Sequence, residues 1–129
     1  MKKLSDYLHL YLGAKCSADG NEFNLAGVEI TDTGTLAYDG TIIDGIHQCW
    51  WVENCGFKLF LRPISDISNS EADEIGYDNA KVFLKDAIQY RDGVGLLIAR
   101  DFHYLLNRRF DLFGLIEAGL AIQQTRETL

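Results

Sequence analysis

The sequence predicts a single α+β domain with a short N-terminal helix, an antiparallel strand meander over residues 14–62, and three C-terminal helices. Turn signals of the Asp-Gly type recur at short intervals up to Arg62, between runs rich in Val, Ile, Thr, Phe and Trp. After Pro63, the only proline, apolar residues recur at helical spacing instead. With 129 residues, 47% of them apolar, the chain has the size and composition of one folded domain, residues 1–129.

A short amphipathic helix is expected over residues 4–12. Apolar and aromatic residues recur there at helical spacing, namely Leu4, Tyr7, Leu8, Tyr11 and Leu12, and Ser5 is placed to cap the start. Gly13 is placed to end the helix in a left-handed turn. A helix of this length is unstable alone, so it must pack on the residues that follow.

The strand-rich part is expected to contain consecutive tight hairpins. The turns fall at Asp19-Gly20-Asn21, Asp32-Thr33-Gly34, Asp39-Gly40 and Asn54-Cys55-Gly56. Strands are therefore expected near residues 14–18, 22–31, 35–38, 41–44, 46–53 and 57–62. Such an antiparallel meander leaves two strand edges open, and a half-open small barrel is the alternative that hides them.

The helical part, residues 68–122, is expected to open with a capping box formed by Ser68 and Glu71. Three helices are expected after it: residues 80–91, capped by Asn79; residues 98–107; and Leu112–Ala118, capped by Asp111 and closed by Gly119. Residues 94–99 fit either a buried strand or the lead-in to a helix. The polar tail, residues 123–129, is expected to fray.

The net charge of −7, with a pI near 4.8, argues against general affinity for nucleic acid, which requires clustered Lys and Arg. Five carboxylates and no Lys or Arg lie between Asp66 and Asp78. Carboxylates interact favourably with a helix N-terminus, so this stretch fits a solvated helix start. An acidic docking surface is the alternative.

Three cysteines without a secretory leader predict reduced thiols and a cytoplasmic protein. No apolar run reaches the length of a membrane span, so no membrane association is expected. No motif calls for a cofactor: Gly93-Val94-Gly95 lacks the third glycine and the Lys of a phosphate-binding loop.

The triplet Asp32-Thr33-Gly34 matches the signature of aspartic proteases, in which two subunits each supply one carboxylate. The context differs from that family, since Ile30-Thr31 stands where an apolar pair is required and Thr35 stands where Ala or Ser is required. A hairpin loop with Gly34 in the left-handed position explains the triplet better.

The cysteines and histidines offer two further chemical hypotheses. His47 and Cys49 share one face of a strand and Cys55 follows on a turn, which is a weak candidate for a metal site. Any cysteine beside a histidine could also be a nucleophile, and Cys55, expected to be the most exposed, would be the most reactive. A small buried residue at Cys49 and a turn residue at Cys55 explain the pattern without metal or catalysis.

The double tryptophan is the most informative feature. Alternation sends Trp50 and Val52 to one face of a strand and Trp51 to the other. On the following strand, Phe60 lies on the face of Lys58 and Arg62, opposite Phe57, Leu59 and Leu61. The Trp51 and Phe60 face either lies beneath the C-terminal helices or forms an exposed platform near Lys58 and Arg62, able to bind a partner chain or a stacked base.

Three segments together resemble a family of small proteins encoded by phages and prophages of Bacteroidetes, for which no activity is assigned. The segments are MKKLSDYLHLYLG (residues 1–13), LRPISDIS (61–68) and FDLFGLIEAGLAI (110–122). They cover about a quarter of the chain, and the double-tryptophan region departs from the family pattern. The resemblance implies a bacterial cytoplasm as the setting and supplies no functional residues.

These observations favour a non-enzymatic interaction protein that binds another protein or a second copy of itself. Its binding surface would be the strand layer or the acidic helix start. A nucleic-acid-associated small barrel using Trp51, Phe60, Lys58 and Arg62 is the second hypothesis, which the acidic charge disfavours. An enzyme, either a protease or a thiol enzyme, is the third.

Overall fold

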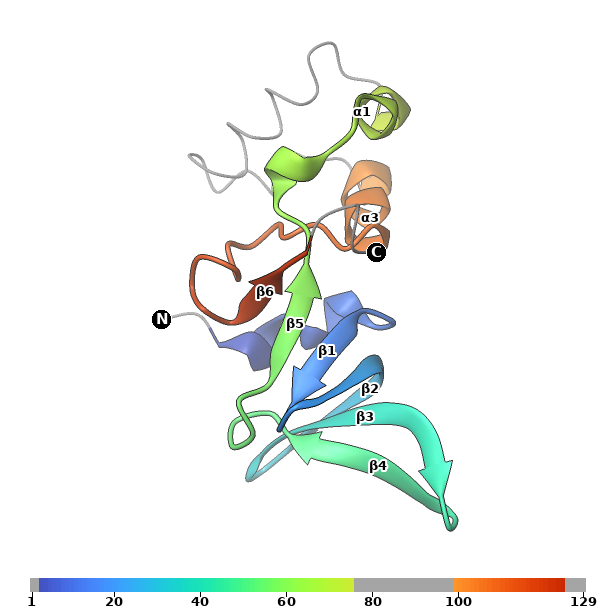
Figure 1. Ribbon diagram of the computed structural model, residues 1–129, viewed down its shortest axis with the longest axis vertical. Coiled ribbons are helices and arrows are strands. Elements are labelled where there is room, and N and C mark those ends of the chain that lie inside the picture. Colours follow the sequence, from blue (N-terminus) through green and yellow to red (C-terminus); the bar gives the residue numbers. More distant parts are fainter. Residues whose placement is uncertain (1–2, 76–98, 125–129) are drawn as a thin grey trace.

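Six strands form one mixed β-sheet in the computed structural model of the chain, which describes residues 3–75 and 99–124 (Figure 1). The strands are β1 (Lys15–Ala18), β2 (Asn21–Thr31), β3 (Gly34–Ile43), β4 (Ile46–Trp51), β5 (Lys58–Leu61) and β6 (Ala121–Gln123). Across the sheet their order is β4, β3, β2, β1, β5, β6. Neighbouring strands are antiparallel except β5 and β6, which are parallel.

The first four strands form consecutive hairpins, as the turn signals predict. Asp19 and Gly20, with φ of 50° and 81°, form the two-residue turn between β1 and β2. The predicted strands 35–38 and 41–44 are one strand, β3, because Asp39-Gly40 interrupts its pairing without reversing the chain.

β5 departs from the predicted meander. It pairs with β1 and β6, so that Cys16 lies opposite Leu59 and Leu59 opposite Ala121, whereas the prediction placed it beside β4. Among the described residues the sheet therefore stays open, with β4 and β6 at its edges, and the half-open barrel does not form. This pairing joins segments far apart in the sequence, which local turn signals do not reveal.

The N-terminal segment forms two 3-10 turns, η1 (Leu4–Asp6) and η2 (Leu8–Tyr11), where one helix over residues 4–12 was expected. Tyr7 separates them with φ of −119°, outside the helical range. So short a segment takes its conformation from packing, here of Leu8 and Tyr11, which are fully buried. Gly13 ends the second turn with φ of 90°, as predicted.

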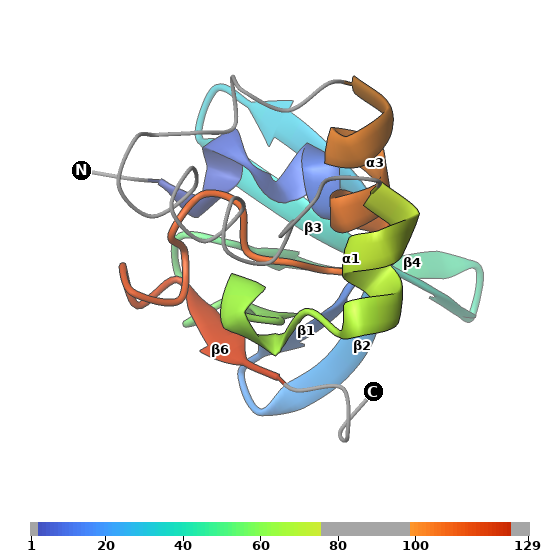
Figure 2. The same cartoon turned by 90° about the horizontal axis from the view of Figure 1, so that it is seen from above.

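The C-terminal part contains less helix than predicted, and this is the main correction to the fold class. After a 3-10 turn, η3 (Ile64–Asp66), the described residues contain two short α-helices, α1 (Asn69–Ile75) and α3 (Ala99–Asn107). They lie side by side at one end of the molecule (Figures 1 and 2). The predicted helix over 80–91 with its Asn79 cap, and residues 94–98 of the ambiguous segment, lie outside the described residues, as does the tail from residue 125.

Leu112–Ala118 is a series of turns and not the predicted helix. The Asp111 carboxylate accepts hydrogen bonds from the backbone N–H groups of Phe113, Leu115 and Ile116, so the residue does act as a cap. Gly114, however, has φ of 72° and breaks any helix at its third residue. The chain then turns at Gly119 and enters β6, a strand that the sequence analysis missed.

The core lies between the sheet and the two terminal segments. Phe57, Leu59 and Leu61 face it, which confirms the predicted alternation of that strand. Trp50 also faces inward, with its ring stacked on Phe23 at 4.4 Å between centroids. The N-terminal turns contribute Leu4, Leu8 and Tyr11, and the C-terminal segments contribute Leu105, Leu106, Phe110, Leu112 and Leu115.

Arg62, only 2% exposed, forms an ion-pair cluster directly after β5. Its Nε donates to Asp66 Oδ2 at 3.0 Å, and its two terminal nitrogens donate to the two Glu71 carboxylate oxygens at 2.8 Å each. The guanidinium carbon lies 4.2 Å from the centre of the Phe110 ring. The Arg62 and Phe110 segments also pair through backbone hydrogen bonds from Arg62 N–H to Arg109 O and from Asp111 N–H to Arg62 O.

Glu71 links this cluster to the start of α1. Ser68 N–H donates to Glu71 Oε1, and Glu71 N–H donates to Ser68 Oγ, so the predicted capping box is confirmed. The hydrogen bonds from Arg62, together with those from Ser68, lower the Glu71 pKa from 4.5 to about 2. One carboxylate therefore both caps the helix and neutralises a buried cation.

Tyr11 ties the N-terminal turns to the C-terminal segment. Its hydroxyl donates to the Phe110 carbonyl oxygen at 2.6 Å and accepts from Leu112 N–H at 3.3 Å. The three segments that carry the family resemblance thus meet around Tyr11, Arg62 and Phe110.

We expect Glu71→Gln to remove part of the acid sensitivity of folding. Because the folded pKa of about 2 lies below the ordinary value of 4.5, Glu71 stabilises the fold fully above pH 4.5, and this contribution is lost as pH falls towards 2. A shift of this size corresponds to about 3 kcal/mol. Urea titrations between pH 7 and pH 2 should show a smaller loss of unfolding free energy in Glu71→Gln than in the wild type.

Glu117→Gln is the matched control, because it removes an exposed carboxylate elsewhere in the chain. It should keep the wild-type dependence of stability on pH. Equal pH dependence in Glu71→Gln and the wild type would contradict the assigned role of the ion-pair cluster.

Candidate protein-interaction site

The β3–β4 hairpin extends beyond the rest of the sheet as a two-stranded projection, residues 40–48, which we call the arm (Figure 1). β2 accompanies β3 only as far as Asp39, which lies opposite Leu25. At the tip, Asp44 and Gly45 have φ of 52° and 79°, the two positive values of the turn that joins antiparallel strands through a two-residue loop. The tip of the arm therefore has the geometry of a two-residue hairpin turn.

The arm could have been recognised from the sequence. Asp44-Gly45 lies between Ile43 and Ile46, and an Asp-Gly pair flanked by apolar residues is among the strongest hairpin signals. The predicted strands 41–44 and 46–53 do meet at this turn, although Asp44-Gly45 was not named as its signal. A further turn was predicted at Asp39-Gly40, where the structure has only a shift of register between Tyr38 and Ile42.

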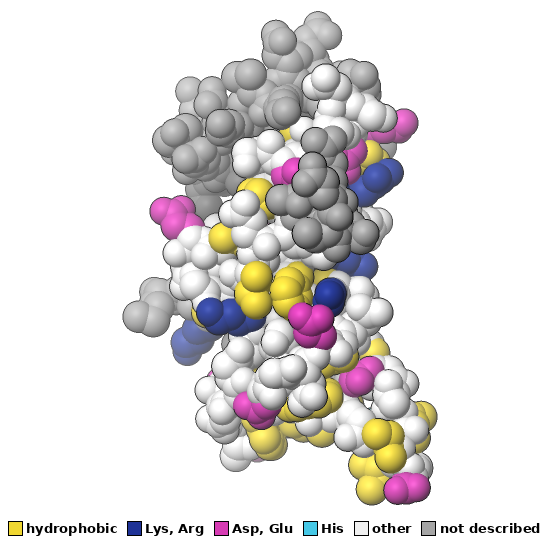
Figure 3. Space-filling model, viewed as in Figure 1, with side chains coloured by type: hydrophobic (Ala, Val, Ile, Leu, Met, Phe, Trp, Pro, Cys, Tyr) yellow, Lys and Arg dark blue, Asp and Glu magenta, His cyan; other side chains and the backbone are white. Residues whose placement is uncertain are grey.

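The arm exposes apolar side chains that normally lie in a core. Ile42, Ile43 and Ile46 are 56%, 53% and 66% exposed, and Trp51, at the other end of β4, is 39% exposed. Figure 3 shows the hydrophobic side chains gathered on this projection at the lower right of the molecule. Clustered exposed apolar groups mark interaction surfaces more often than isolated ones do.

β4 presents an open backbone edge. Val52 N–H donates to the Thr35 carbonyl oxygen across the β3–β4 ladder, and hydrogen-bonding direction alternates along an antiparallel strand. The backbone groups of Trp50, Gln48 and Ile46 therefore point towards β3. Those of His47, Cys49 and Trp51 point away from β3, to the side where the described sheet ends. The outward Trp51 carbonyl oxygen accepts from Asn54 N–H at 3.1 Å in the turn that follows β4, so the open part of the edge runs from His47 to the Trp51 N–H.

The same edge carries no charge. Among the described strands of four or more residues, β4 alone has no Asp, Glu, Lys or Arg. Proteins usually protect exposed sheet edges with charged side chains, proline, bulges or very short strands. The opposite edge, β6, is protected in this way by its length of three residues, whereas β4, with six, is not.

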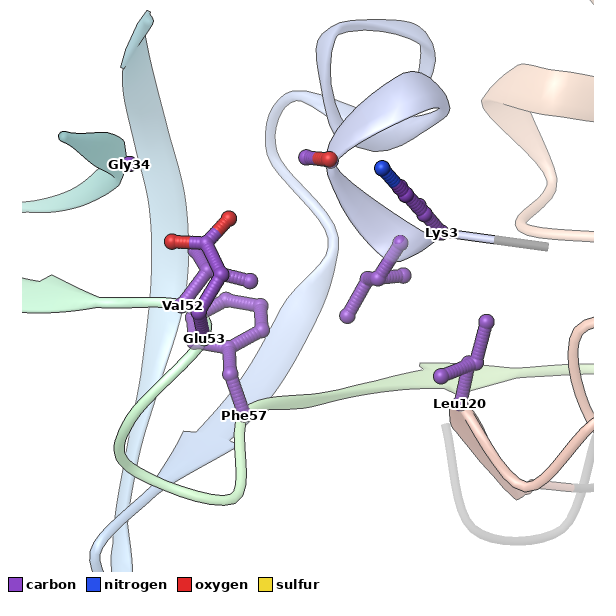
Figure 4. Close-up of a pocket in the computed structure, with 8 residues that line it drawn as sticks. Lys3, Gly34, Val52, Glu53, Phe57 and Leu120 are labelled. Atoms are coloured by element: carbon purple, nitrogen blue, oxygen red, sulfur yellow. The ribbon is translucent and has the colours of Figure 1, made fainter. Parts of the chain in front are cut away.

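A cavity of about 490 Å³ opens beside the end of β4 (Figure 4). Its apolar wall is formed by Leu4, Val52, Phe57 and Leu120. Lys3 and Glu53 stand on opposite sides of it in Figure 4. The Glu53 carboxylate accepts a hydrogen bond from Thr35 N–H at 2.8 Å, which fixes one side of the opening.

The four residues predicted to form an aromatic and basic face do not lie together. Trp51 is on β4, whereas Lys58 and Phe60 are on β5, and three strands separate them. Phe60 is half-buried, with the Lys15 ammonium 5.2 Å from its ring centre, and Arg62 is buried in its ion pairs. Of the predicted face, Trp51 alone lies on the β4 edge, at the end of the strand away from the arm.

The cysteine and histidine residues are also dispersed. His47 and Cys49 share a face of β4, as predicted, but Cys55 lies in the turn beside the β1 end, where its carbonyl oxygen accepts from Asp19 N–H. In the described ranges no three His, Cys, Asp or Glu side chains are grouped so that they could hold a metal ion. All three cysteines are free thiols, and Cys49, not Cys55, is the exposed one.

The remaining candidates have structural roles. Asp32 and Thr33 form an exposed two-residue turn between the paired residues Thr31 and Gly34, which confirms the hairpin interpretation but shortens the predicted loop by one residue. In the acidic stretch, Asp66 and Glu71 bind Arg62, so these two carboxylates do not form an acidic docking surface.

Comparison of the chain with models of known protein families, with curated proteins and with solved structures gives no match. Within the described residues, no helix has the length and apolar character needed to cross a membrane. The evidence for the candidate site is therefore the geometry of the arm and of the β4 edge.

We expect Cys49 to react first with a thiol-specific reagent in dilute solution at neutral pH. Burial raises the pKa of Cys16 to about 12, and its thiol donates to the Phe23 carbonyl oxygen; burial and the nearby Asp19 also raise the pKa of Cys55. Ellman's reagent followed by peptide mass spectrometry should find one fast thiol, which Cys49→Ser removes. Fast modification of Cys16 or Cys55 in the folded protein would contradict this order.

Proposed function

We propose that the protein is a non-enzymatic interaction module that binds an extended strand of a partner protein along β4. The observation that carries this proposal is the uncharged β4 edge, with outward backbone groups at His47 and Cys49 and an outward N–H at Trp51. In strand addition, backbone hydrogen bonds supply affinity and alternating side chains supply specificity. An edge without charge or proline is suited to this mode of binding.

The exposed isoleucines support the same conclusion. A two-stranded hairpin without a third strand is at best marginally stable in water. The arm has that construction, and it leaves Ile42, Ile43 and Ile46 in contact with solvent. A strand bound along β4 would become a third strand for the arm and would cover apolar surface at the same time.

The proposal places the protein in a bacterial cytoplasm. Three free thiols fit a reducing compartment, and the resemblance of residues 1–13, 61–68 and 110–122 to phage and prophage proteins supports a phage-derived origin.

Site-specific photo-crosslinking in bacterial cells tests the proposed function without knowledge of the partner. With His47→p-benzoylphenylalanine, irradiation should give a discrete adduct of higher mass, because this position lies on the open edge. Adding Cys49→Pro should reduce the adduct strongly, since proline removes an N–H that points outward and leaves the β3 ladder intact. Denaturing gels and mass spectrometry of the adduct provide the measurement.

Ile30→p-benzoylphenylalanine is the matched control. Ile30 is 76% exposed but lies on β2, away from the β4 edge, so the same photoreactive group there should give no discrete adduct. If position 47 gives no adduct, or if adducts form equally at positions 30 and 47, β4 is not a binding edge.

A further inference from the structure

We infer that the partner strand is β4 of a second copy, so that the chain forms a two-fold symmetric dimer through an antiparallel β4–β4 pair. This inference rests on the proposed function and names its partner. Three properties of β4 support this partner: the register that symmetry allows, the lack of charge, and the positions of the exposed Ile46 at one end and of the cavity lined by Val52 at the other.

The register follows from symmetry. When a strand pairs with its own copy about a two-fold axis perpendicular to the sheet, one residue must lie opposite itself. The outward backbone groups belong to His47, Cys49 and Trp51, and the Trp51 carbonyl oxygen already accepts from Asn54 N–H. A pair centred on Cys49 uses the outward groups of His47 and Cys49 and the Trp51 N–H. His47 then lies opposite Trp51 of the second copy, Cys49 opposite Cys49, and Trp51 opposite His47.

Charge favours a second copy at this edge more than at other surfaces. Each chain carries a net charge of −7, so two copies repel each other unless they meet where the surface is neutral. From Ile46 to Val52 the sequence is uncharged, bounded by Asp44 two residues before and Glu53 immediately after. The contact centred on Cys49 lies in the middle of this neutral strip.

The same register brings an exposed isoleucine at one end of β4 to a cavity with an apolar wall at the other end. The register centred on Cys49 places Ile46 opposite Val52 of the second copy, with both side chains on the inner face of the sheet. Val52 lines the 490 Å³ cavity together with Leu4 and Phe57. Ile46, 66% exposed in one chain, would thus reach the mouth of an apolar cavity in the other. By symmetry this contact occurs twice, as expected of a self-complementary interface.

Sedimentation equilibrium of the full chain tests the dimer. The wild type should shift with concentration from a mass of 14.5 kDa to twice that value. Cys49→Pro should weaken dimerisation by about thirtyfold, because each of two symmetric contacts loses a hydrogen bond. Ile46→Asp should also weaken it, because it places a carboxylate against the apolar wall formed by Leu4, Val52 and Phe57. Ile30→Asp, at another exposed but distant site, should leave it unchanged.

Disulfide formation tests the register. Copper–phenanthroline oxidation of the Cys55→Ser variant should give a covalent dimer through Cys49, because the hydrogen-bonded pair places the two Cα atoms about 5.5 Å apart, within disulfide range. In Cys49→Ser/Cys55→Ser/Gln48→Cys the new thiols lie diagonally, on the other face, and should crosslink at least tenfold more slowly. Faster crosslinking at position 48 than at position 49 would overturn the register.

The outcomes separate this inference from the proposed function. A chain that stays monomeric at all concentrations, while position 47 crosslinks to a different protein in cells, would overturn the dimer and leave strand addition standing. A dimer that persists in both Cys49→Pro and Ile46→Asp would place the contact elsewhere and overturn the inference. Circular dichroism of each variant shows that the chain is folded, and Ile46→Asp, at an exposed site, remains available if Cys49→Pro is not.

Discussion

The buried guanidinium of Arg62 is the interaction on which the arrangement of the chain depends. An arginine that is 2% exposed must have its charge neutralised and its N–H groups satisfied, and no single segment of this chain does both. Asp66 and Glu71 supply the carboxylates, and Phe110 supplies an aromatic face. The end of β5, the start of α1 and the segment after α3 are therefore held at one point.

This constraint accounts for the open edge at the other side of the sheet. Once Arg62 is fixed beside Phe110, the C-terminal segment runs past β5 and returns as β6, parallel to it. β5 then has β6 on one side and β1 on the other, so it cannot also pair with β4. β5, which the predicted meander placed beside β4, therefore pairs with β1 and β6, and β4 lies at the edge of the sheet formed by the described residues. The ion-pair cluster thus affects the candidate site indirectly: it fixes the neighbours of β5, and the resulting strand order leaves β4 at the edge.

Sequence reasoning succeeded where the determining interactions are local. The Ser68–Glu71 capping box spans four residues, and the hairpins from β1 to β4 depend on adjacent turn residues. Sequence reasoning failed where the determining interactions join residues far apart in the sequence. The β1–β5 pairing joins distant segments, and the aromatic face assumed that Trp51 and Phe60 were neighbours. The prediction of a helix over Leu112–Ala118 was wrong for a local reason. It relied on the helical spacing of the apolar residues and gave too little weight to Gly114, which takes a positive φ, and to Asp111, whose carboxylate holds a turn.

The candidate site was found in part by the same reasoning. Trp51 was identified because alternation placed it away from the core, and the structure leaves it partly exposed. The isoleucines of the arm were missed because Ile42, Ile43 and Ile46 match an ordinary buried strand by composition. Only the strand order shows that no neighbour accompanies them beyond Asp39 among the described residues. Whether a strand lies at a sheet edge depends on the strand order, which the sequence pattern does not give. The lack of charged residues in β4 therefore indicates a binding edge only once the strand order is known. On a chain with a net charge of −7, a neutral edge of six residues is the place where a close approach of two copies costs least electrostatically.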